Sequence, residues 1–382
     1  MKLLAPGTYF LTGNVAVAEA ALLAGCRFYA GYPITPSSDL MHHMARRLPE
    51  VGGVFIQAED EIAAINMVLG ASAAGLKAMT ATSGPGLSLM EEALGLGFML
   101  ELPAVIVDVM RVGPSTGIPT LGSQGDVMQC IWGSHGDRET VVFAPSTVQE
   151  AFDLTIRAFN VSEELRLPVF VLTDEFIAHT YGRVVVPEHV EVVDRKRVEA
   201  PTPDFKPFKA DNLVPPFPEP GKGLRFHFTG LMHDERGYPI ISKTATDKLL
   251  RRLLNKVRST RNKLVDFEVI EFGTPRILVV AYGSLASILR CAFSKYRDEA
   301  RNVVLFRPRV LWPAPDIELR TFVEKQGVEH VIVAELNYGQ YLHVVKEAVG
   351  DAAKVSFVSF TPGFYPSPRE ALNSILEVIK HG

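Results

Sequence analysis

The run Ala-Val-Ile-Val-Asp-Val-Met at positions 104–110 decides the fold class, because it is apolar at every position but one. A second run, Pro-Val-Phe-Val-Leu-Thr at 168–173, has the same character. Strands that are apolar on both faces are typical of a parallel sheet covered by helices on both sides. Both runs therefore predict central strands of an α/β sheet.

Further short apolar runs surround these two strands, and helical stretches alternate with them through residues 1–190. The expected strands are Arg27–Ala30, Gly53–Ala58, Lys77–Thr82, Ala104–Met110, Thr140–Ala144 and Pro168–Thr173. The expected helices are Asn14–Ala24, Ser38–Leu48, Asp60–Ala74, Gly86–Leu100 and Thr147–Leu165. This alternation predicts an open, mostly parallel α/β sheet as the first domain.

The pattern changes between residues 191 and 268. Prolines recur from Pro201 to Pro220, too densely for a regular helix or strand. We expect an extended connector draped over a surface, followed by a basic helix near Thr246–Arg258.

Residues 269–382 return to the strand–helix pattern. Four strand-like runs, RILVVAYGS, NVVLF, HVIVAE and KVSFVSF, are separated by helical segments, and the last helix is expected at Arg369–Lys380. The sequence therefore predicts a second, smaller α/β domain with its own core.

Composition excludes several classes of protein. The chain has 382 residues, of which 47% are hydrophobic and 21% charged, with a formal net charge of -4. These values exclude a disordered or collagen-like chain, and no basic excess suggests nucleic-acid binding. The candidate membrane span, an uncharged stretch between Lys77 and Glu91, is broken by Gly84 and Pro85 and is shorter than the roughly twenty residues that a membrane span needs. We expect a soluble, cytoplasmic protein that does not insert into a membrane.

The three cysteines, Cys26, Cys130 and Cys291, lie far apart and form no CxxC pair. An iron–sulfur cluster generally needs four thiolates, so this chain cannot build one alone. We expect no disulfide and no metal ligand in this chain, and we expect each cysteine to be a small buried hydrophobic residue.

The chain also lacks the common nucleotide-binding motifs. Gly70 to Lys77 approaches a P-loop, but Leu76 stands where the lysine should follow the glycine, and no G-x-G-x-x-G follows a strand. A nucleotide-dependent dehydrogenase and a non-catalytic scaffolding subunit remain as alternatives from other classes.

Three polar segments follow predicted strands of the first domain: Tyr32–Ser38, Glu59–Glu61 and Arg111–Gly117. Each has an ordinary structural explanation, since serines cap helices and acidic residues suit the first turn of a helix. All three, however, lie at the carboxyl edge of the sheet, where open α/β sheets bind their ligands. This edge is therefore the candidate site.

The motifs YPITPSS, QAEDEIAA, TSGPGLSLM and RVGPSTG, followed by TGLMHDERG and ELNYGQ, occur in the order and spacing of one family. The chain resembles the alpha subunit of the 2-oxoacid:ferredoxin oxidoreductases, closest to the 2-oxoglutarate (2-oxoglutarate synthase) type. The resemblance covers nearly the whole chain. It implies a pyrimidine-binding domain for thiamine diphosphate, followed by a domain like the C-terminal domain of transketolases.

The same resemblance implies that this chain holds only half of an active site. The family's magnesium and diphosphate site, together with a [4Fe–4S] cluster, belongs to a separate beta subunit. The implied reaction is oxidative decarboxylation of a 2-oxoacid with coenzyme A to acyl-CoA and CO2, and ferredoxin is reduced. Activity would require the beta subunit, in a hetero-oligomer such as (alpha–beta)2.

The resemblance also assigns residues. Glu61 would contact N1′ of the aminopyrimidine and help thiamine diphosphate lose its C2 proton, with Glu59 as the alternative carboxylate. Thr35 and Arg111 would bind the 2-oxoacid carboxylate, and Ser37 is a weaker candidate. The remaining contacts to the cofactor are expected from Ile34, Ser83, Gly84 and Pro85.

The chain departs from the family pattern in one loop. Val112 replaces a glycine, and Leu121 stands where members that act on 2-oxoglutarate often have a lysine. A branched-chain 2-oxoacid or pyruvate therefore stays open as the substrate beside 2-oxoglutarate, which we favour.

Overall fold

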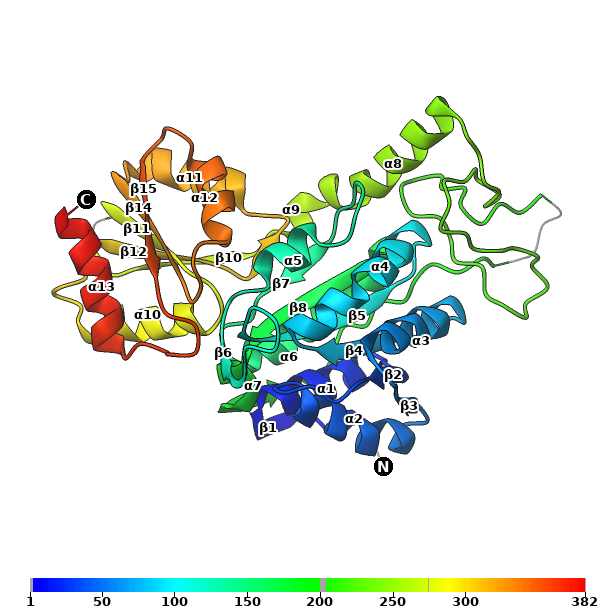
Figure 1. The fold of residues 1–382 in the computed structure, drawn as a ribbon, viewed down its shortest axis with the longest axis horizontal. Helices are drawn as coiled ribbons and strands as arrows, with labels where there is room; N and C mark the ends of the chain where they lie inside the picture. Colours follow the sequence, from blue (N-terminus) through cyan, green and yellow to red (C-terminus); the bar gives the residue numbers. More distant parts are fainter. Residues whose placement is uncertain (1–2, 200–203, 274, 382) are drawn as a thin grey trace.

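The computed structural model of the chain describes residues 3–199, 204–273 and 275–381. Figure 1 shows two β-sheets with their helices, and a long connector that loops away from both sheets and returns through one helix. Pro201 and Pro203, part of the Pro-rich stretch singled out in the sequence, lie outside the described residues.

The first sheet is built around the run that begins at Ala104. Its strand order is β13-β7-β8-β5-β4-β2-β3, and β6 pairs with the end of β5. The strands β2, β3, β4, β5, β7 and β8 are parallel, which confirms the predicted α/β sheet. Their bounds are β2 Phe28–Gly31, β3 Val54–Gln57, β4 Ala78–Thr82, β5 Ala104–Val112, β6 Ile118–Gly122, β7 Val141–Phe143, β8 Pro168–Asp174 and β13 Val310–Trp312.

Helices follow these strands and pack on the sheet in pairs, α1 with α6 and α3 with α4. Local sequence signals set their ends. For example, Thr12 caps α1 by accepting a hydrogen bond from the Val15 amide, and Gly25 follows the end of α1 with a φ of +93°. The helices are α1 Gly13–Leu23, α2 Ser38–Glu50, α3 Glu61–Ala73, α4 Gly84–Met99, α5 Val127–Trp132, α6 Val148–Leu165 and α7 Glu175–His179. Near the N-terminus, β1 Gly7–Thr12 pairs antiparallel with β9 Tyr181–Val186.

The second sheet has the order β10-β12-β11-β14-β15. It is parallel except for β10, which pairs antiparallel with β12. The elements are β10 Phe267–Glu271, β11 Ile277–Val280, β12 Val303–Pro308, β14 His330–Glu335, β15 Lys354–Ser359, α10 Gly283–Lys295, α11 Asp316–Gln326, α12 Tyr341–Val349 and α13 Pro368–His381. All four predicted strands are present, and β10 was not predicted.

The two sequence blocks are not separate in space. Strand β13 follows β12 in the chain but pairs antiparallel with β7 at the edge of the first sheet. The Ala144 amide also donates to the Arg309 carbonyl at 2.8 Å. A short strand from the second block thus covers an edge that would otherwise expose unpaired backbone groups.

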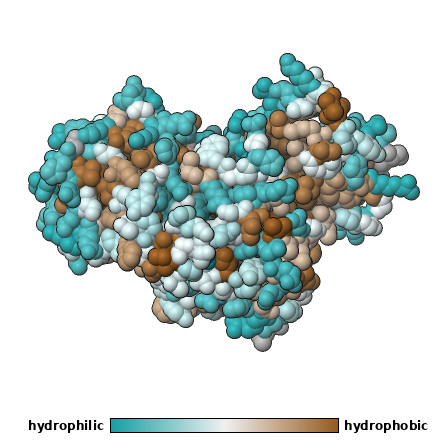
Figure 2. Space-filling model, viewed as in Figure 1, coloured by the Kyte–Doolittle hydropathy of each residue, from teal (hydrophilic) through white to brown (hydrophobic). Residues whose placement is uncertain are grey.

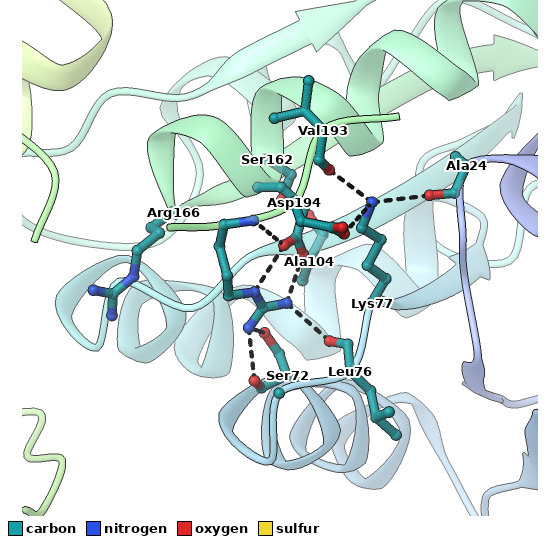
Figure 3. A network of polar contacts seen from close by, with 12 residues as sticks. Ala24, Ser72, Leu76, Lys77, Ala104, Ser162, Arg166, Val193 and Asp194 are labelled. Carbon is teal, nitrogen blue, oxygen red and sulfur yellow. Dashed lines mark hydrogen bonds and ion pairs between the residues drawn. The ribbon is translucent and has the colours of Figure 1, made fainter. Parts of the chain in front are cut away.

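The connector has no strand or helix in its described residues before α8 Lys243–Arg258, which is followed by α9 Arg261–Leu264. The connector is nevertheless anchored by buried charges and is not merely draped over the surface, which corrects the expectation. Arg195 is buried, pairs with Glu163 at 2.6 Å and donates to the carbonyls of Ser72 and Leu76. Figure 3 labels Ser72 and Leu76 and draws the hydrogen bonds that reach them as dashed lines. The Arg195 guanidinium also lies over the ring of Phe217, another buried connector residue.

A second buried ion cluster attaches α8 to the first sheet. Glu101 is fully buried and accepts two hydrogen bonds from Arg252, at 2.6 and 2.8 Å. It also forms an ion pair with Lys256. Burial alone would raise the pKa of Glu101, but Lys256 and Arg252 lower it below its usual range. The carboxylate therefore stays ionised and fixes α8 in place.

We expect Glu101→Gln to reduce the free energy of unfolding by about 3–5 kcal/mol, because buried Lys256 and half-buried Arg252 would lose their counter-ion. Chemical denaturation measures this loss. Glu219→Gln, which breaks the more exposed pair with Arg197, is the matched control and should cost no more than about 1 kcal/mol. Equal effects of the two substitutions would contradict the anchoring role of Glu101.

Candidate functional site

Four loops meet at the carboxyl edge of the first sheet. The strands β5, β4, β2 and β3 are neighbours in that order, whereas along the chain β2 is followed by β3 and only then by β4. The connections after β2 and after β3 therefore lead to opposite sides of β2, and such a switch point opens a crevice at the strand ends. The predicted segments Tyr32–Ser38 and Glu59–Glu61 follow β2 and β3, and Ser83–Pro85 follows β4. The segment Arg111–Gly117 begins with the last two residues of β5 and continues into the loop after it.

Glu61 is the first residue of α3 and is buried. Asp60 caps this helix by accepting a hydrogen bond from the Ala63 amide at 2.8 Å, so the next carboxyl is turned into the protein. Burial raises the pKa of Glu61, nearby Asp60 raises it further, and Arg111 opposes the shift. Glu59, the alternative carboxylate, is exposed.

The start of α4 lies directly against Glu61. A Cβ atom at Gly86 would overlap with the carboxyl of Glu61 and with the hydroxyl of Thr82. Only glycine allows this approach. The hydroxyl of Ser83, just before the helix, is buried and has no hydrogen-bond partner among the described residues.

Arg111 connects the loop after β2 with the end of β5. It is 8% exposed, and its Nη1 donates to the Thr35 carbonyl at 2.8 Å. Its Nε has no hydrogen-bond partner within the part of the chain that the structure describes. Burial lowers the pKa of Arg111, whereas Asp126, Glu61 and Asp108 raise it.

The other predicted residues after β2 are placed differently. Ile34 and Thr35 are half-buried at the site. Ser37 is buried, and its hydroxyl donates to the Ile34 carbonyl at 2.9 Å, so this hydroxyl is engaged inside its own loop.

A cavity of about 630 Å³ opens beside these residues. One wall comes from the first sheet and includes Arg111, the Gly84–Pro85 turn and Asp126. The opposite wall comes from the loop after β14, residues 337–340. The site thus lies between the two sheets.

The motif ELNYGQ, residues 335–340, joins the two sheets at this cavity. Glu335 is fully buried and accepts hydrogen bonds from the Tyr282 hydroxyl and the Asn337 side chain, both at 2.8 Å. Gln124 exchanges hydrogen bonds with the backbone of Leu336 at 3.0 and 2.8 Å. These contacts give the motif a structural role that its sequence alone did not reveal.

Two carboxyl groups of the site were missed in the sequence. Asp108 on β5 is fully buried, and Asp126, just before α5, lines the cavity with one oxygen 2.8 Å from where a Cβ of Gly84 would lie. The signal for Asp108 was visible, because it is the one charged residue in the run 104–110. Asp126 carries no such signal, since its loop is polar.

Within the described residues, no group of three or more His, Cys, Asp or Glu side chains could hold a metal ion. Cys26 and Cys130 are buried, as predicted, but Cys291 is exposed, so the expectation for that cysteine was wrong. None of the helices described is both long and apolar enough to cross a membrane.

Comparison with known proteins gives the same family as the motifs. Residues 19–250 match the thiamine-diphosphate-binding domain of pyruvate flavodoxin/ferredoxin oxidoreductases. Residues 276–371 match core domain II of pyruvate:ferredoxin oxidoreductase.

Similar proteins cover almost the whole chain. The 2-oxoglutarate synthase subunit KorA of Methanocaldococcus jannaschii is 46% identical over 96% of this chain and 99% of that protein. The ketoisovalerate oxidoreductase subunit VorB of Methanothermobacter thermautotrophicus is 38% identical over 97% of this chain and 98% of that protein.

Among solved structures, the 2-oxoglutarate:ferredoxin oxidoreductase from Magnetococcus marinus, solved with 2-oxoglutarate, coenzyme A and succinyl-CoA bound, is 34% identical with a TM-score of 0.91. The match covers 97% of this chain and 65% of that chain. A split-gene transketolase, 12% identical with a TM-score of 0.55 over 97% of this chain and 98% of that chain, shares the fold alone. The chain therefore belongs to the family of the 2-oxoacid:ferredoxin oxidoreductases, as its motifs predicted.

Proposed function

We propose that this chain is the subunit of a 2-oxoglutarate:ferredoxin oxidoreductase that binds the aminopyrimidine of thiamine diphosphate. The reaction is oxidative decarboxylation of 2-oxoglutarate with coenzyme A to succinyl-CoA and CO2, with ferredoxin as the electron acceptor. The observation that carries the proposal is that buried Glu61 and Arg111 lie at the same sheet edge, in a chain 46% identical to a 2-oxoglutarate synthase subunit.

The residues at this edge fit thiamine diphosphate. Glu61 is a buried carboxyl whose raised pKa suits it to share a proton with a ring nitrogen. Gly84 and Gly86 carry no side chains in the first turn of α4, and the hydroxyl of Ser83 is buried without a partner among the described residues. Ile34 and Pro85 complete the predicted contacts. When bound, the cofactor supplies an electron sink for decarboxylation.

Arg111 and Thr35 would hold the carboxylate of the 2-oxoacid. A guanidinium binds a carboxylate through paired, charge-assisted hydrogen bonds, and the Nε of Arg111 has no hydrogen-bond partner among the described residues. The bond from Arg111 to the Thr35 carbonyl fixes the arginine beside the threonine hydroxyl. Ser37 stays a prediction, and we propose that it mainly shapes the loop.

The other half of the site would come from a beta subunit that carries Mg2+, the diphosphate contacts and a [4Fe–4S] cluster. An apolar surface supports such a partner: Ile62 and Met67 on α3 and Leu89 on α4 are 49%, 38% and 48% exposed. Figure 2 shows apolar side chains on the face where these helices lie. We propose a hetero-oligomer such as (alpha–beta)2, located in the cytoplasm, and a chain divided at about residues 190 and 268.

Leu121 bears on the choice of substrate. It does not line the cavity but lies close to Gly363, and the Gly363 amide donates to the Gly122 carbonyl at 2.8 Å. This segment therefore docks a loop of the second block, which explains an apolar residue there without reference to the substrate. We keep 2-oxoglutarate as the proposed substrate, and the similarity to a ketoisovalerate subunit makes 2-oxoisovalerate the alternative to test.

The function is tested by anaerobic viologen reduction with the chain co-purified with its partner. We expect reduction that depends on coenzyme A and is fastest with 2-oxoglutarate, compared with pyruvate and 2-oxoisovalerate. A preference for 2-oxoisovalerate would change the substrate but keep the enzyme class. No reduction with any of them, by a complex shown to contain thiamine diphosphate and clusters, would refute the function.

Glu61→Gln should leave the assembly intact and reduce turnover by at least about 100-fold, because the amide cannot exchange a proton with the ring nitrogen. Steady-state assays at saturating cofactor measure this loss. Glu59→Gln is the matched control, and since Glu59 is exposed we expect it to keep most of the activity. The reverse result would assign the role to Glu59.

Arg111→Lys should raise the KM for the 2-oxoacid by roughly tenfold or more and affect kcat less, because a point charge cannot reproduce two parallel hydrogen bonds. The measurement is the dependence of rate on 2-oxoacid concentration, with coenzyme A saturating. An unchanged KM would remove Arg111 from the substrate site.

A further inference from the structure

Asp108, which is fully buried, and Asp126, which is half-buried, form a carboxyl pair next to Arg111. Asp108 is fully buried on β5, three residues before Arg111, and Asp126 lines the same cavity as Arg111. Neither has a role in the function proposed above.

The surroundings of Asp108 indicate that the carboxyl pair carries a proton. Neither of its oxygens has a hydrogen-bond donor in the described part of the chain, and one oxygen of Asp126 is also unpartnered. The Asp126 carboxyl lies within hydrogen-bonding reach of Asp108, but two carboxylates cannot hydrogen bond unless one carries a proton. Since buried polar groups are generally hydrogen-bonded, the pair shares a proton.

Asp108 is the member that holds this proton. Burial raises the pKa of Asp108 well above its usual range, and the negative charges of Asp126 and Glu91 raise it further. Burial also raises the pKa of Asp126, to about 6, while the hydrogen bond from Asp108 and the charge of Arg111 act in the opposite direction. At neutral pH the pair therefore carries a single negative charge, on the member that faces the cavity.

Arg111 is not neutralised by direct contact with a carboxylate. Within the described residues, no ion pair within 4 Å joins its guanidinium to an acidic side chain. Its Nε also has no hydrogen-bond partner among them, even though the side chain is buried, with 8% of its surface exposed. Asp126 acts on it across the cavity that both residues line, and the burial of Arg111 makes this electrostatic interaction stronger than it would be in bulk water.

We propose that Asp126 is a positioning residue that acts through Arg111. Its carboxylate, hydrogen-bonded to a protonated Asp108, is a titratable counter-charge that sets the affinity of Arg111 for the substrate carboxylate. This inference rests on the function proposed above. When Asp126 is charged, it weakens the electrostatic attraction between Arg111 and the anionic substrate. When it is neutral, the full attraction of the guanidinium is available.

Other ionisable groups lie near the carboxyl pair, and the test must separate their effects from that of Asp126. Glu91 on α4 and Cys130 on α5 adjoin Asp108 and Asp126, Arg138 adjoins Glu91, and Glu61 faces Arg111 from α3. A pH effect on substrate affinity could arise from Glu61 as well as from Asp126, so the two sources must be separated by substitution.

The experiment measures KM and kcat for the 2-oxoacid from pH 5 to pH 8 with the complete complex. The wild-type KM should rise by about tenfold as pH increases through about 6, because Asp126 gains its charge there. In Asp126→Asn this rise should disappear and KM should stay near its low-pH value, with kcat changed much less. A rise that persists in Asp126→Asn would come from Glu61 and would overturn the proposal.

Asp108→Leu provides a second, independent test. It removes the hydrogen bond that favours ionised Asp126, so the midpoint of the KM rise should move to higher pH by about one unit. Asp137→Asn, which removes an equal charge from an exposed loop, is the control and should keep the wild-type profile. An unmoved midpoint in Asp108→Leu, or a wild-type KM that does not change with pH, would overturn the inference. A wild-type complex with no turnover would instead overturn the proposed function.

Discussion

The first turn of α4 is packed between the buried carboxyl group of Glu61 and the half-buried carboxyl group of Asp126, and the site depends on this constraint. Gly86 lies against Glu61 on one side, and Gly84 lies against Asp126 on the other. A side chain at either position would push the helix away from the sheet edge or displace a carboxyl group. Because helix N-termini favour negative charge, the same turn gives both acids a partial positive neighbour that limits the effect of burial on their pKa values.

The second sheet contributes to this arrangement through backbone contacts. Gln124 and the residues after β14 exchange hydrogen bonds, and Gln124 also donates to the Tyr282 carbonyl at 2.8 Å. The loop that carries Asp126 is therefore held on both sides, by α4 and by the second sheet. A shift of one sheet against the other would move Asp126 relative to Arg111 and change the field in the cavity. The position of the second sheet thus affects the electrostatic potential in the cavity as well as the shape of the site.

The sequence was sufficient for the features that depend on local pattern. The apolar run 104–110 and the helical stretches that alternate with the strands predicted the first sheet, and the polar segments at strand ends predicted which loops meet at its carboxyl edge. Long-range features could not be read in this way. Strand β13 pairs with β7 across more than 160 positions of sequence, and Arg195 is buried only because Glu163 and two carbonyls converge on it. Prolines showed that the connector lacks regular structure, but nothing local showed what it packs against.

Charge balance supports the proposal that the site is divided between two subunits. Arg111 is the one cationic residue that lines the cavity within the described part of the chain, and Asp126 already offsets part of its charge. A dicarboxylate such as 2-oxoglutarate brings two negative charges, of which Arg111 can balance one at most. Leu121 offers no second cation, because it is committed to docking the loop around Gly363. Burying the distal carboxylate without a counter-ion would be costly, so we expect the partner subunit to supply that cation. Selection among 2-oxoacids would then be decided by the partner, while this chain recognises the carboxylate that all of them share.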